Sequence, residues 1–144
     1  MELAEKYPVL RRFHKPRMHG IRHLAETGEF PAPNFDSCPA TKKEWAFGPG
    51  GNIYGCTATV GNPIYRLGTY APAIQRDEKA IALWRERNVL TIPECKTCAM
   101  ATVCGGGCGA VAAHRTKGDP RATDCRPVRE IFGLGAKFYG LDRE

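Results

Sequence analysis

The stretch CKTCAMATVCGGGC, residues 95–108, holds four cysteines, with three glycines between the last two. The chain carries seven cysteines in total: Cys38, Cys56, Cys95, Cys98, Cys104, Cys108 and Cys125. In order they read C-x12-G-x4-C, a gap, C-x2-C-x5-C-x3-C, a second gap and a final C. Cysteines at such short spacings are typical of metal sites in chains from reducing compartments.

The rest of the chain indicates such a compartment. Its 144 residues suggest one domain, or a domain with a terminal extension, and its 16 Gly and 11 Pro predict many turns. The start MELAEKYPVLRRF carries charges where a secretory signal would be apolar, and no run approaches the roughly 18 apolar residues of a membrane span. We therefore expect a cytoplasmic protein with no membrane partner, whose cysteines bind metal rather than form disulfides.

The formal charge is +6 and the sequence pI is about 9.0, a balance that can mark a nucleic-acid binder. The basic residues are scattered, however, and bound anionic clusters would offset part of their charge. We therefore expect a solvated basic surface and no nucleic-acid partner. The basic positions considered are Arg11, Arg12, Lys42, Lys43, Arg85, Arg87, Arg115, Lys117, Arg126 and Arg129.

Local patterns predict the elements around the cysteines. A helix is expected over residues 17–27, ended by Gly28, with the linker PAPN at 31–34 after it. The segment EWAFGPGGNIYGC, residues 44–56, predicts a β-hairpin that brings Cys56 to the end of the return strand. Its glycine-rich turn lacks the lysine and following helix of a phosphate-binding loop.

After the hairpin, the sequence predicts an extended piece around residues 64–67 and a helix through Asn88 that Asp77 caps. Further helices are expected over residues 109–118 and from about Pro127. The last helix is expected to present one apolar stripe, formed by Ile131, Leu134, Phe138 and Leu141.

Zinc is the first candidate for the metal. A structural zinc ion takes four ligands, usually from two knuckles a dozen or more residues apart. Cys95 and Cys98 fit one knuckle, but Cys104 and Cys108 crowd it. Three further cysteines would then need a second site.

Iron–sulfur clusters fit the spacing better, because in two-cluster ferredoxins the last cysteine of a compact run ligates the other cluster. By the same logic the run here would serve two sites. The first group would combine the last cysteine of the run with the two early ones: Cys38, Cys56 and Cys108. The second group would combine the other three with the distal one: Cys95, Cys98, Cys104 and Cys125. Gly105, Gly106 and Gly107 would let backbone pass close to a cluster and offer amide hydrogens to its sulfurs.

This pattern resembles the SPASM domain, the C-terminal auxiliary-cluster domain of many radical S-adenosylmethionine enzymes. The family motif is C-x9-15-G-x4-C, a gap, C-x2-C-x5-C-x3-C, a gap and C; Gly51 and all seven cysteines match it, over roughly residues 36–128. The resemblance implies two auxiliary [4Fe–4S] clusters, held by the first and second groups. It also implies a small, loop-rich, metal-stapled α+β fold, with a β-hairpin and short helices around the clusters.

The first cluster departs from the pattern of some relatives. Anaerobic sulfatase-maturating enzymes have an extra cysteine shortly after the first, and here no cysteine lies between Cys38 and Cys56. The expected alternatives are an open iron, which would bind a substrate group directly, and a non-cysteine ligand such as Asp36 or Glu44.

The chain also lacks the C-x3-C-x2-C motif and the barrel of roughly 200 residues or more that cleave S-adenosylmethionine. The C-x3-C of Cys104 and Cys108 is followed by Val111 where a third cysteine would stand. We therefore expect S-adenosylmethionine only in a barrel domain, in cis upstream or in trans. The expected divisions are 1–34, a helical and extended segment that would form the tail of that barrel; 35–128, the two-cluster domain; and 129–144, a C-terminal helix. Met1 would be an internal methionine of a longer enzyme or the start of a shortened gene.

The function implied by the resemblance is electron transfer or substrate positioning for an enzyme that modifies a peptide or protein. A stand-alone ferredoxin-like carrier and a zinc-stapled interaction module are the alternatives, and whether the chain is itself an enzyme is left open. No catalytic residue is predicted.

Two smaller sets complete the expectations. His19 and His23 have a spacing that can bind metal, but no acidic residue lies between them, so surface histidines are expected. Trp45, Tyr54 and Trp84 are expected to pack the core rather than line a peptide groove.

Overall fold

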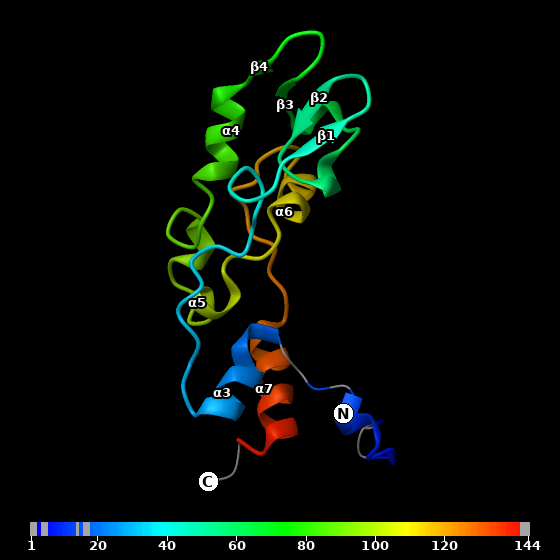
Figure 1. The fold of residues 1–144 in the computed structure, drawn as a ribbon. Coiled ribbons are helices and arrows are strands. Elements are labelled where there is room, and N and C mark those ends of the chain that lie inside the picture. Colours follow the sequence, from blue (N-terminus) through cyan, green and yellow to red (C-terminus); the bar gives the residue numbers. More distant parts are fainter. Residues whose placement is uncertain (1–2, 4–5, 14, 16–17, 142–144) are drawn as a thin grey trace. The chain divides into compact units, whose positions relative to one another are not determined.

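The computed structural model describes residues 3, 6–13, 15 and 18–141, which form two compact units (Figure 1). Unit 1 combines the two ends of the chain, 1–33 and 126–144, and unit 2 is the continuous segment 34–125. Every cysteine lies in unit 2, and all seven are free thiols. Among the described helices, none has the length and apolar character to cross a membrane.

Unit 1 is helical. Its elements are α2 (Leu10–Phe13), a 3-10 turn η1 (Met18–Gly20), α3 (Ile21–Thr27) and α7 (Val128–Tyr139). α3 ends at Gly28, which has a left-handed φ of 77°, as predicted. It begins later than predicted, because His19 and Gly20 have φ values of 56° and 75° and interrupt the helix. The expected start, Arg17, lies outside the described residues.

The apolar stripe predicted for the C-terminal helix is partly wrong. Leu134 and Leu141 are 50% and 43% exposed, whereas Val128 and Gly135 are buried. A Cβ added at Gly135 would lie 2.9 Å from Ile21 Cγ1, so α3 approaches α7 at this glycine. The buried face of α7 therefore includes Gly135, which has no side chain and so does not count among the apolar residues that predict a buried face.

Unit 2 contains a four-stranded antiparallel sheet with strand order β1-β2-β3-β4 (Figure 1). The strands are β1 (Ala46–Gly48), β2 (Asn52–Tyr54), β3 (Arg66–Thr69) and β4 (Gln75–Arg76). Phe47 lies opposite Ile53, which confirms the predicted hairpin. The extended piece expected around 64–67 begins only at Arg66, because Pro63–Tyr65 forms the 3-10 turn η3. Together with its helices, unit 2 is a small mixed α/β arrangement, as expected in outline.

The helical elements of unit 2 are short. They are the 3-10 turns η2 (Thr57–Thr59) and η4 (Pro93–Cys95) and the helices α4 (Glu78–Arg85), α5 (Ala101–Cys104) and α6 (Gly109–Arg115). Asp77 caps α4 as predicted, accepting a hydrogen bond of 2.9 Å from the Ala80 amide. α4 ends at Arg85, before the predicted Asn88.

The apolar residues of unit 2 form two clusters. The larger contains Tyr54 and Leu67 of the sheet, Ile81 and Trp84 of α4 and part of α6, with Trp45 packed against it. The smaller contains the buried residues Val89, Ile92 and Cys95, with Ala101 packed against it. Figure 1 shows α5 at the end of unit 2 away from the sheet. The three aromatic residues therefore pack the core of the sheet end, as predicted.

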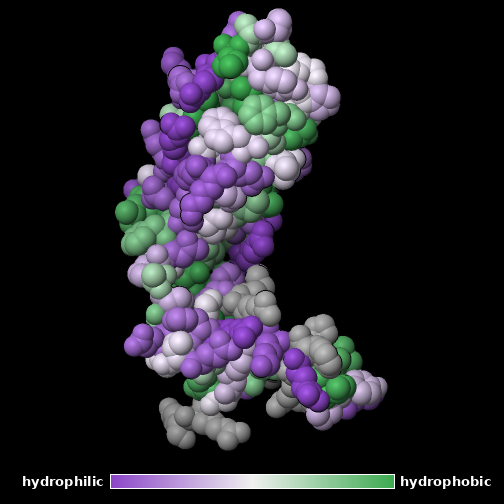
Figure 2. All heavy atoms as spheres, viewed as in Figure 1, coloured by the Kyte–Doolittle hydropathy of each residue, from purple (hydrophilic) through white to green (hydrophobic). Residues whose placement is uncertain are grey.

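The surface over the strands keeps some apolar character. Phe47 is 64% and Tyr70 40% exposed, and their rings meet edge to face at 5.5 Å between centroids. Figure 2 shows hydrophobic surface over this part of unit 2. The aromatic pair therefore lies outside the core, on the sheet.

Candidate metal centre

The first group of cysteines lies in the larger apolar cluster. Cys38 and Cys56 are buried in it, and Cys108 packs against it. Cys56 stands between β2 and η2, and Cys108 precedes α6. Segments that are distant in the sequence thus deliver three thiols to one apolar cluster.

The pKa of one thiol of this group, Cys56, depends on its surroundings. Burial raises the pKa of the Cys56 thiol, and the charges of Glu44 and Cys38 act in the same direction. A hydrogen bond between Cys56 Sγ and the Thr59 hydroxyl, 3.9 Å apart, opposes the rise in the pKa of Cys56. The charges that raise the pKa of Cys56 thus come from Glu44 and from Cys38, a member of the same group.

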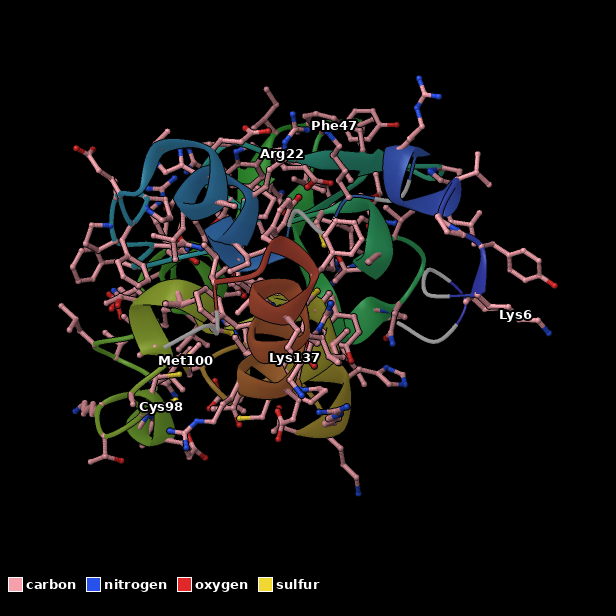
Figure 3. All side chains as sticks on the ribbon, turned by 90° about the horizontal axis from the view of Figure 1, so that it is seen from below. Lys6, Arg22, Phe47, Cys98, Met100 and Lys137 are labelled. Atoms are coloured by element: carbon pink, nitrogen blue, oxygen red, sulfur yellow. The ribbon has the colours of Figure 1, made fainter. Side chains whose placement is uncertain are left out.

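One cysteine of the second group, Cys95, is buried in the smaller cluster, whereas Cys98 and Cys125 are exposed. Burial raises the pKa of the Cys95 thiol, and the thiols of Cys125, Cys104 and Cys98 raise it further, whereas Arg87 lowers it. The pKa of Cys95 therefore responds to the other three thiols of this group. Cys98 is exposed on the same loop as Met100, both labelled in Figure 3. The electrostatic influence on Cys95 thus comes from the three cysteines that the spacing assigns to the same group.

In neither group do the thiols lie close enough together, within the described residues, to hold a single metal ion. Across residues 3, 6–13, 15 and 18–141, no three Cys, His, Asp or Glu side chains lie close enough to hold a metal ion. Four thiolates bound to one zinc ion at 2.3 Å would lie only about 3.8 Å from one another. A [4Fe–4S] cluster carries its thiolates on separate iron atoms, which sets them farther apart. The thiols would therefore have to close up more for zinc than for a cluster.

The three glycines form the loop between Cys104 and Cys108. Gly105, Gly106 and Gly107 have φ values of 69°, 80° and 70°, three successive left-handed residues that other side chains rarely tolerate. Ser37 holds two of their carbonyls: its amide and Oγ donate to Gly105 O at 3.0 and 3.1 Å, and Oγ also donates to Gly107 O at 3.0 Å. The loop is therefore anchored, not a flexible turn.

Arg87 is the residue of this site that the sequence analysis missed. It was expected on a solvated basic surface, but 0% of it is exposed. Its guanidinium makes four hydrogen bonds, all to backbone carbonyls. Two go to the glycine loop: Nη2 donates to Gly106 O at 2.5 Å and Nη1 donates to Gly107 O at 3.2 Å. The other two go to the segment before Cys125: Nε donates to Pro120 O at 2.5 Å and Nη2 donates to Ala122 O at 3.4 Å. It thus ties the glycine loop to the segment that leads to Cys125.

Gly109, the first residue of α6, marks the contact between Arg87 and the first group. A Cβ at this position would lie 2.9 Å from Cys38 Sγ, 3.2 Å from Arg87 Cδ and 3.2 Å from Trp84 Cζ3. The stem of Arg87 and the Cys38 sulfur therefore meet across this glycine, which leaves no room for a side chain.

Two amides of the glycine loop lack acceptors. In a planar trans peptide the N–H points away from the carbonyl of the same unit, so the Gly106 and Gly107 amides face away from the groups that hold the loop's carbonyls. The Cys108 amide donates to Asp124 Oδ2 at 3.1 Å, but in the described part of the chain no acceptor lies on the Gly106 or Gly107 amide. Gly106 is buried and Gly107 partly buried, and unpaired backbone donors are rare where the backbone is shielded from water. Cluster sulfurs accept such hydrogen bonds, so the thiols and these amides fit an iron–sulfur cluster.

The two carboxylates considered as a fourth ligand of the first group differ in their contacts. Asp36 Oδ1 accepts from the Cys38 amide at 2.9 Å, and its Oδ2 pairs with the Lys42 ammonium. Glu44 uses Oε1 to accept from the Thr57 amide at 3.1 Å. Both oxygens of Asp36 are engaged, whereas the side-chain hydrogen bonds of Glu44 among the described residues use Oε1, which leaves Oε2 for a ligand.

The prediction of two surface histidines is wrong for His19. Its Nε2 is buried and has no hydrogen-bond partner among the described residues, whereas His23 is exposed on α3. The left-handed backbone at His19 also places it outside α3, so the pair does not share a helix face.

No protein-family model matches the chain, and no curated protein matches it. The resemblance to the SPASM domain therefore depends on the cysteine spacing.

Proposed function

We propose that unit 2 is a SPASM-type domain that binds two auxiliary [4Fe–4S] clusters. It would serve electron transfer or substrate positioning for a radical S-adenosylmethionine enzyme that modifies a peptide or protein. The observation that carries this proposal is the division of the cysteines. Cys104 and Cys108 lie in one short run, yet Cys104 acts on the pKa of Cys95, whereas Cys108 packs against the larger apolar cluster, which contains Cys38 and Cys56.

The residues that would hold each cluster follow from this division. The first cluster would take Cys38, Cys56 and Cys108, with Glu44 as the fourth ligand. The second cluster would take Cys95, Cys98, Cys104 and Cys125. The bound clusters would supply one-electron transfer. The chain would bury them, orient their thiolate ligands and direct the Gly106 and Gly107 amides toward sulfur.

The partner of this domain would be the barrel that binds S-adenosylmethionine, joined in cis or acting in trans. A peptide or protein substrate would lie between that barrel and the clusters. This arrangement assigns the radical chemistry to the barrel and electron delivery or substrate positioning to unit 2.

The test is the content of iron, zinc and acid-labile sulfide per chain, measured on protein purified without oxygen. Two clusters predict about eight iron and eight sulfide. About four of each would mean that only one site, expected to be the second, holds its cluster. Zinc without sulfide would overturn the proposal and favour the zinc-stapled module. An in-frame barrel in the genomic sequence upstream would favour an enzyme domain joined in cis over a ferredoxin-like carrier.

A pair of matched variants tests the division of the run. Cys104→Ser should remove the second cluster and Cys108→Ser the first, each lowering iron by about four atoms per chain. The electron paramagnetic resonance signal that survives should differ between the two. If both variants lost the same signal, the two cysteines would serve one site and the division would be wrong.

A further inference from the structure

The buried arginine of unit 2 has no role in the function proposed so far. Arg87 is fully buried, and arginine is almost never fully buried unless it is paired. Its four hydrogen bonds satisfy N–H groups but carry no negative charge, and no ion pair of Arg87 occurs within the described residues. A buried guanidinium without a counter-charge is costly. Its position therefore calls for an anion nearby.

The surroundings of Arg87 indicate where that anion would lie. Its guanidinium contacts the glycine loop between Cys104 and Cys108 and the segment before Cys125. Its stem meets Cys38 Sγ across Gly109. Arg87 thus touches segments of both cysteine groups, and a thiolate-ligated cluster in either group would be anionic because the thiolates outweigh the charge of the core.

The backbone of Arg87 is anchored to the first group as well. The Lys42 ammonium donates to the Arg87 carbonyl at 2.9 Å and pairs with Asp36, whose other oxygen accepts from the Cys38 amide. The side chain and the carbonyl of Arg87 therefore connect the first group to the glycine loop through a continuous set of hydrogen bonds.

We propose that Arg87 is a positioning residue for the metal centre. It fixes the glycine loop so that the Gly106 and Gly107 amides face the cluster sulfurs, and its charge balances that of the bound clusters. This inference rests on the proposed function. Both effects stabilise the reduced cluster, which carries one more negative charge, so both raise the reduction potential.

Two substitutions separate charge from positioning. Arg87→Met keeps an unbranched apolar stem and removes both the charge and the hydrogen bonds. Arg87→Lys keeps the charge but cannot reach four carbonyls in two segments with one ammonium. Arg85→Met, at an exposed position in the last turn of α4, is the matched control.

The experiment uses the full chain reconstituted without oxygen. Iron content, cluster loss to a chelator and midpoint potential, from a redox titration followed by electron paramagnetic resonance, are measured. Arg87→Met should hold at most half of the wild-type iron, lose it at least fivefold faster and show a lower potential. Arg87→Lys should lose its clusters faster but keep a potential closer to the wild type. Arg85→Met should match the wild type.

The outcomes distinguish this inference from the proposed function. If the wild-type chain binds no iron or sulfide, both fail. If it binds its clusters and Arg87→Met has the same iron and potential, only the role of Arg87 is wrong. If Arg87→Met does not fold, the potentials and cluster loss rates of Ser37→Ala and Arg87→Lys test the inference instead. Ser37 is suitable because it is exposed and its hydroxyl holds the same loop. Wild-type potentials and cluster loss rates in both would overturn the inference.

Discussion

Replacing Gly109 with alanine adds one methyl group where the first cysteine group meets Arg87. The added Cβ would lie 2.9 Å from Cys38 Sγ and 3.2 Å from both Arg87 Cδ and Trp84 Cζ3, where ordinary contacts begin at 3.4 Å. Trp84 is 3% exposed and has little space to move. Overpacking costs about 1–3 kcal/mol, and the better helix propensity of alanine offsets at most about 1 kcal/mol. We therefore expect Gly109→Ala to lower the free energy of unfolding by about 1–2 kcal/mol.

The assay is urea unfolding of the reconstituted protein without oxygen, together with its iron content. The midpoint should fall, and iron loss should be confined to the first cluster, about four atoms per chain. Gly133→Ala is the control, because no atom lies within 4 Å of the Cβ that it adds on α7. It should stabilise the chain slightly, by up to about 1 kcal/mol. A wild-type midpoint and full iron in Gly109→Ala would mean that Cys38 and Arg87 do not pack against α6 as described.

Three further predictions address the core, the fourth ligand and the thiols. Trp84→Ala should destabilise the chain by about 3–5 kcal/mol in urea unfolding, because it removes a buried indole; a loss below 1 kcal/mol would contradict the core. Glu44→Gln should lower iron at the first site, whereas Asp36→Asn should keep both clusters; equal iron contents in the two variants would argue against Glu44 as a ligand. In the metal-free chain, iodoacetamide should label exposed Cys98 before Cys95, since burial raises the pKa of the Cys95 thiol and lowers its thiolate fraction. The difference should narrow as the pH rises through that raised pKa, and mass spectrometry that finds equal rates near neutral pH would refute it.

The elements predicted correctly from the sequence are those that depend on local chemistry. The hairpin follows from alternation around a glycine-rich turn, the start of α4 from Asp77 and the end of α3 from Gly28. Each signal lies within a few residues of the feature that it specifies. The assignment of the cysteines to two groups stays a prediction from their spacing, because ligands of one site recur at short intervals.

The features missed depend on contacts between distant segments. β4 pairs with β3 through Gly68 and Arg76, and nothing in its two polar residues marks a strand. Arg87 looks like any basic residue, because its partners are carbonyls of the glycine loop and of the segment before Cys125. Arg87 also lies beyond the end of α4 at Arg85, so helical periodicity does not mark it as buried.

The hydrogen bond from Ser37, the residue before the first cysteine, bears on the order in which the domain assembles. Ser37 and Gly105 are joined by a hydrogen bond that spans 68 positions, and the first cysteine group can form only when such distant segments have met. Three members of the second group lie within one short run, so their approach closes much smaller loops. Contacts that close long loops form slowly. Maturation should therefore proceed in order, with the second site loading before the first and the first acting as the late step that completes the fold.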